Sequence, residues 1–142
     1  MKQILLIFSI LLLLVSCDND ELPQSDVPFA LVAKGDSFPN DQSIAQRHLV
    51  IKDAKTWNKF MKEMNFSIEK NIDFSQYQVI AVIDKTQPND GHSIDIVEMT
   101  ENRNTIIVKV EKLKNGNLTK KSSRPYDVVK TAKTDKKVVF EQ

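Results

Sequence analysis

The chain contains two histidines, the side chains that most often act as a general base near neutral pH. His48 lies in an apolar segment typical of a strand, and His92 follows the turn residue Gly91. Nucleophilic catalysis needs a base next to a nucleophile, and neither histidine belongs to a recognisable constellation of that kind. His92 is the better functional candidate because a partner can approach the backbone at Gly91, although an ordinary surface turn residue is the alternative. The sequence therefore predicts a protein that is not an enzyme.

Metal and cofactor sites are not predicted either. The histidines lack the His-x-His or His-x-x-x-His spacing of metal ligands, and the chain has one cysteine, Cys17. Carboxylate and amide side chains gather between Asp84 and Asp95, but without the alternating spacing and closing glutamate of a calcium loop. Turn formation explains them better. The three glycines are too far apart to build a phosphate-binding loop, so we expect no cofactor and no metal.

Cys17 stands at the end of a leader rather than in a site for catalysis. A short basic start, Met1-Lys2-Gln3, is followed by the apolar run Ile4–Val15. That run is too short to span about 30 Å of hydrocarbon comfortably, and it fits the apolar part of a signal peptide. The last residues, Leu14-Val15-Ser16-Cys17, resemble the bacterial lipobox. We predict that residues 1–16 are a signal peptide and that Cys17 is lipidated; an incidental cysteine behind an ordinary secretion leader is the alternative.

The segment after Cys17 predicts where the protein is held. Residues 17–28 are acidic at first, contain two prolines and lack an apolar period, which indicates a flexible tether. The cluster Asp18–Glu21 resembles the export signal of bacterial surface lipoproteins; a solvated spacer and retention at an inner membrane are the alternatives. Two or three acyl chains anchor a protein stably. We expect a protein of the cell envelope, at the outer membrane or cell surface in preference to the inner membrane.

Length and charge limit the remaining possibilities. Residues 29–142 have the length of a single globular domain. Because Lys2 is the only charged residue ahead of Cys17, 19 basic and 19 acidic side chains remain after the leader. This balance gives no net field that would attract nucleic acid, so we expect no nucleic-acid partner.

One amphipathic helix is expected near the middle of the chain. Asp53 is a typical N-cap residue, and the apolar side chains that follow recur at the spacing of one helix face: Trp57, Phe60, Met61 and Met64. The pattern predicts a helix over about 54–65. Trp57 is interpreted as a core residue of this helix rather than a ligand-stacking residue, because it shares its face with the other three.

The remaining apolar segments are expected to form strands. Tyr77–Asp84 is apolar on both faces, which predicts a central strand, and Pro88–Gly91 predicts a turn and a hairpin to the alternating segment His92–Met99. Further strands are expected at 29–34, 44–52, 105–113, 126–131 and 136–140. The predicted class is α+β, with one main helix packed on a mostly antiparallel sheet of five to seven strands.

The order of these motifs resembles the PrcB C-terminal domain family from about His48 to Phe140. The shared features are a strand entering a helix with a tryptophan, an Asp-Phe-Ser lead-in to an apolar strand, a glycine hairpin and a Pro-Tyr-x-Val-Val strand, here Ile51–Trp57, Asp73–Ser75, Asn89–Ile94 and Pro125–Val129. The hairpin departs from the family pattern of two glycines followed by tyrosine. Here it keeps Gly91 alone and has His92 in place of the aromatic ring.

The resemblance implies a function. The family's namesake looks like a lipoprotein subunit that associates with and stabilises a bacterial surface protease complex, with no catalytic residues to carry over. A membrane-anchored, non-catalytic interaction domain that binds another protein, an exported protease, is therefore implied. Loops carry function more often than core faces, so we expect partner contacts at Pro88, Asn89, Asp90, Gly91, His92, Arg124, Pro125 and Tyr126. The alternative is a small-ligand or glycan-binding envelope lipoprotein, which would need a concave pocket around a side chain such as Tyr126.

Overall fold

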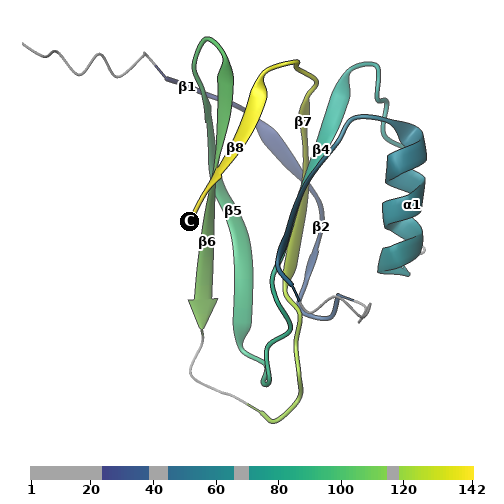
Figure 1. Ribbon diagram of the computed structural model, residues 1–142, viewed down its shortest axis with the longest axis vertical. Helices are drawn as coiled ribbons and strands as arrows, with labels where there is room; N and C mark the ends of the chain where they lie inside the picture. The colour runs from purple at the N-terminus through teal and green to yellow at the C-terminus, as the bar shows by residue number, and fades with distance from the viewer. Residues whose placement is uncertain (1–23, 39–44, 66–70, 115–118) are drawn as a thin grey trace, which may run out of the picture.

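The computed structural model describes residues 24–38, 45–65, 71–114 and 119–142. These residues form eight strands and one helix, arranged as two packed sheets with the helix on the outer side of one of them (Figure 1). The predicted signal peptide and Cys17 lie outside the described residues. Within the described residues, we find no helix with the length and apolar character needed to cross a membrane.

The first sheet has the strand order β1-β5-β6-β8. Its members are β1 (Ser25–Asp26), β5 (His92–Glu101), β6 (Thr105–Lys114) and β8 (Lys137–Glu141). The pairs β1–β5 and β5–β6 are antiparallel, whereas β8 runs parallel to β6. The predicted tether is thus ordered at its end, because two of its residues pair with β5, and strand structure begins before Phe29.

The second sheet has the order β2-β7-β4-β3, and all its pairs are antiparallel. Its members are β2 (Phe29–Gly35), β7 (Tyr126–Ala132), β4 (Tyr77–Ile83) and β3 (Arg47–Ile51). The predicted central position of β4 is confirmed. Its apolar residues alternate between two cores: Ile80 and Val82 face the first sheet, whereas the alternate residues face the helix, namely Val79, Ala81 and Ile83.

Helix α1 (Ala54–Met64) confirms the predicted helix. The side chain of Asp53 accepts the backbone N–H of Thr56 at 2.8 Å, and Asn65 ends the helix in the left-handed region with φ of 51°. Trp57 is 5% exposed and packs with Phe60 in the core between the helix and the second sheet, which confirms its predicted structural role.

The α+β class is confirmed, but the prediction of one sheet with five to seven strands is wrong, because the strands divide into two sheets of four. The predicted hairpin between β4 and β5 is wrong as well. Residues 84–91 instead carry the chain from the second sheet to the first. The physical reason is burial: β4 is apolar on both faces and needs a layer on each side, whereas β5 has one apolar face and forms part of the outer layer.

Different contacts join the two sheets on the two sides of the sandwich. On one side the ring of His48 from β3 stacks on Phe140 from β8, with 4.6 Å between ring centroids. On the other side the carboxylate of Asp127 accepts the backbone N–H of Ile96 at 2.9 Å, and Lys34 forms an ion pair with Asp95. These contacts fix the two sheets relative to each other.

Candidate functional site

Two segments that the sequence predicts as partner contacts meet at one end of the sandwich, at the foot of Figure 1. Gln87 and Ser123 exchange backbone hydrogen bonds of 2.8 and 3.1 Å, which join the β4–β5 connection to the segment before β7. The hydroxyl of Ser123 also donates to the backbone oxygen of Asn89 at 2.7 Å. Three hydrogen bonds with Ser123 therefore restrain the predicted turn and the residue that precedes it.

Side chains within the turn add further restraints. Nε2 of His92 and Oδ1 of Asn89 are hydrogen-bonded at 2.7 Å. Asp90 accepts the hydroxyl and the backbone N–H of Thr119, and these hydrogen bonds lower the pKa of its carboxyl. Gly91 has φ of 79°, where a side chain would be strained. The turn is a defined shape rather than a loose loop.

The predicted contacts at the start of β7 are buried. Arg124 is 2% exposed, donates to the backbone oxygen of Asp84 at 3.3 Å, and has its guanidinium carbon 5.1 Å from the centre of the Phe38 ring. Tyr126 is 5% exposed and meets the same ring edge-on at 5.8 Å. Pro125 is buried too. These side chains support the end of the sandwich from within, so among the predicted contacts it is the turn Pro88–His92 that a partner can reach.

The ion pair between Asp84 and Lys112, close to the turn, is not predicted from the sequence. Asp84 is 1% exposed, with Nζ of Lys112 at 2.8 Å from one carboxylate oxygen and the amide of Gln87 donating to the other at 2.8 Å. Burial on its own would raise the pKa of Asp84, but the hydrogen bonds from Lys112 and Gln87 outweigh it and lower the pKa. The alternation of side chains along β6 could have indicated this ion pair, because it places Lys112 on the same face as the buried Val108 and Val110.

The chemistry of this end of the molecule is hydrogen-bond recognition. His92 is engaged with an amide rather than with a nucleophile. Among the residues that the structure describes, no three His, Cys, Asp or Glu side chains lie close enough to hold a metal ion. The turn offers backbone groups and the half-buried polar side chains of Asn89, Asp90 and His92 to a partner, with Pro88 exposed beside them.

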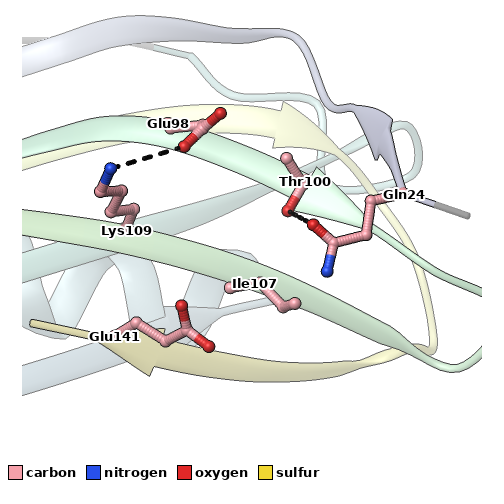
Figure 2. Close-up of a pocket in the computed structure, with 6 residues that line it drawn as sticks. All are labelled: Gln24, Glu98, Thr100, Ile107, Lys109 and Glu141. Carbon is pink, nitrogen blue, oxygen red and sulfur yellow. Dashed lines mark hydrogen bonds and ion pairs between the residues drawn. The ribbon is translucent and has the colours of Figure 1, made fainter. Parts of the chain in front are cut away.

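A separate hollow of about 230 Å³ lies on the outer face of the first sheet (Figure 2). It is lined by Gln24, Glu98, Thr100, Ile107, Lys109 and Glu141. Two pairs of these side chains already contact each other: Lys109 lies 3.9 Å from Glu98, and the hydroxyl of Thr100 donates to Gln24 at 3.3 Å. Thr100 is near the end of β5 opposite to His92, so the hollow is distinct from the predicted turn site.

Comparison with known proteins supports the resemblance read from the motifs. No curated protein and no solved structure matches the chain. The family described as PrcB C-terminal matches residues 78–132, a segment that runs from β4 to the end of β7 and contains both predicted contact segments. The suspected family is therefore confirmed over this segment: residues 78–132 of the chain match the PrcB C-terminal family.

Proposed function

We propose that this protein is a lipid-anchored lipoprotein of the bacterial cell envelope whose domain binds another protein and stabilises or modulates an exported protease complex, without catalysis of its own. The observation that supports this most strongly is the PrcB C-terminal match over residues 78–132. The matched segment contributes the turn Pro88–His92, whose first residue is exposed, and the buried residues Arg124 and Tyr126.

The shape of the turn supports a role in binding. A segment that is already fixed loses less conformational entropy when a partner docks, so more of the contact energy is available as affinity. Here the fixing contacts are the Gln87–Ser123 backbone pair, the Asn89–His92 hydrogen bond and the Asp90–Thr119 contacts. Partner recognition would use Pro88 and the polar edge of His92, where this chain differs from the family's usual aromatic residue.

The membrane anchor supports the same proposal from the sequence side. Lipidation of Cys17 would hold the domain at a membrane surface through the tether, which raises its local concentration near a membrane-associated partner. An accessory subunit needs that proximity more than it needs a deep cleft. The outer membrane or cell surface is the proposed location, on the basis of the acidic cluster after Cys17.

The proposal is tested by affinity purification of the tagged, full-length protein from its native envelope. The variant carries Asp90→Ala and His92→Ala and leaves Gly91 unchanged, because Gly91 has a positive φ. The matched control carries Glu98→Ala and Thr100→Ala on the outer face of the first sheet. We expect an exported protease to co-purify with wild type and control and to be lost with the turn variant. Equal recovery with all three would contradict the proposed contact, and recovery of no protein from any would contradict the proposed function.

A further inference from the structure

Strand β2 is an edge strand with an apolar surface. It pairs with β7 on one side, and no described strand pairs with its other side. Large apolar side chains are exposed at its first residues, where Phe29 is 36% and Leu31 is 60% exposed, and Tyr77 at the end of β4 is 36% exposed. An unpaired strand edge presents a row of backbone N–H and C=O groups, whose natural partner is another extended chain.

Phe29 and Leu31 point toward the first sheet, which leaves both side chains partly exposed. The register places Phe29 opposite Thr131 and Leu31 opposite Val129, and Val129 belongs to the core between the sheets. The outermost strand of the first sheet on this side, β1, has two residues, Ser25 and Asp26, before the chain leaves the sheet. A strand added beside β2 would therefore cover apolar surface on this face.

The opposite face of the same edge is hollowed. A depression of about 340 Å³ is lined by Pro28, Phe29, Ala30, Tyr77, Lys130, Thr131 and Ala132. Nζ of Lys130 lies 4.9 Å from the centre of the Tyr77 ring. Among the described residues, no carboxylate lies within ion-pair distance of Lys130. The hollow thus combines apolar walls with a positive charge that has no acidic partner there.

We propose that the edge of β2 at Phe29–Leu31 binds an extended, acidic and apolar segment of a partner protein, which adds to the second sheet as a further strand. Alternate side chains of such a segment point to opposite faces. Apolar side chains on one face cover Leu31, and acidic side chains on the other face place a carboxylate near Lys130, in the hollow beside Tyr77. This inference rests on the proposed protein-binding function and names the chemistry of the partner segment.

A second copy of this chain fits the edge less well. Pairing of two β2 strands about a two-fold axis at Ala30 would bring the Lys130 of both copies to one continuous hollow without supplying a carboxylate to either. A longer pairing would cross the β-bulge between Leu31 and Ala33, which interrupts a regular ladder. A partner segment that carries a carboxylate supplies that group, and a short segment avoids the bulge.

The test uses the full-length protein in detergent and three fluorescent octapeptides: one of alternating valine and glutamate, one of alternating valine and lysine, and a valine–glutamate peptide interrupted by proline. Leu31→Asp blocks the apolar face, Lys130→Glu reverses the charge, and Leu113→Asp is the control, since Leu113 is 53% exposed on another strand. Thermal unfolding and circular dichroism verify that each variant is folded.

We expect the valine–glutamate peptide to bind wild type and the Leu113→Asp control, and to bind at least ten-fold more weakly to Leu31→Asp and Lys130→Glu. Lys130→Glu should instead prefer the lysine peptide, and the proline peptide should not bind. Absence of binding, equal binding of the proline peptide, or a dimer that Leu31→Asp dissociates would each overturn the inference. If the peptides fail while the protease still co-purifies, the inference fails and the proposed function stands; if both fail, the proposed function fails with it.

Discussion

The carboxylate of Asp127 on β7 accepts the backbone N–H of Ile96 on β5 at 2.9 Å. A side chain of the second sheet is thus hydrogen-bonded to the backbone of the first. The second oxygen of Asp127 is buried and has no hydrogen-bond partner among the described residues. Burial raises the pKa of Asp127, and the negative charge of Asp95 adds to this, while the Ile96 hydrogen bond and Lys34 oppose it. This contact between the sheets is therefore made by a carboxylate that is costly to ionise.

The pH dependence of stability follows from this raised pKa. The stability that Asp127 contributes is fully present below its unfolded pKa and is lost as pH rises through its folded pKa. Asp127→Asn keeps an oxygen that accepts the Ile96 N–H and removes the titration. The stability of the variant minus that of wild type should rise between pH 4 and pH 7, measured by urea unfolding. A constant difference would contradict the expectation.

The contribution of His48 to stability should depend on pH in the opposite direction. Burial lowers the pKa of His48, and the charge of Lys112 lowers it further. Its contribution to stability is present above the unfolded pKa of 6.5 and is lost as pH falls through the folded pKa. His48→Phe retains a ring to stack on Phe140. We expect wild type to lose more thermal stability than the variant between pH 7 and pH 5; parallel curves would show that His48 is not responsible.

Gln78 offers a stabilising substitution. Its side chain is 0% exposed on β4, and neither of its amide atoms has a hydrogen-bond partner among the described residues. Leaving a buried polar group unpaired costs about 1–3 kcal/mol, so Gln78→Met, which has a similar volume, should raise the free energy of unfolding by an amount of that order. Denaturant unfolding measures the change. A destabilised variant would show that the amide has a partner in solution.

Lipidation is tested at Cys17, the one thiol of the chain. Metabolic labelling with an alkyne fatty acid should mark the wild-type protein, and Cys17→Ala should abolish the label and release the protein from the membrane fraction. As a control, Asp26→Ala keeps Cys17 and should remain labelled. Retention of the label by Cys17→Ala would contradict the predicted lipid anchor.

The sequence predicts local structure better than the arrangement of the sheets. The helix could be predicted because Asp53, Trp57 and Met64 occur at the spacing of a capped amphipathic helix. The sequence predicts the turn at Pro88–Gly91, but it does not predict that this turn connects two sheets. A turn motif specifies a local change of direction, whereas the choice of sheet depends on which apolar faces meet in the folded core.

The candidate site shows the same division. The motif resemblance predicts partner contacts at the turn and at the start of β7, and the structure brings the two segments together through Gln87 and Ser123. The burial of Arg124 could not be predicted, because an arginine beside a turn is normally solvated. It depends on Phe38, a residue distant in sequence, which packs against the guanidinium.

The most direct test of the protein-binding role is photo-crosslinking in living cells, with a photoreactive phenylalanine analogue at Pro88, which is exposed at the turn. The same analogue at Lys109, on the outer face of the first sheet, provides the comparison. We expect position 88 to yield one dominant crosslinked product, an exported protease or a subunit of its complex, and position 109 to yield much less of it. Crosslinks from position 88 to lipid alone, or to the same proteins as position 109, would contradict the account.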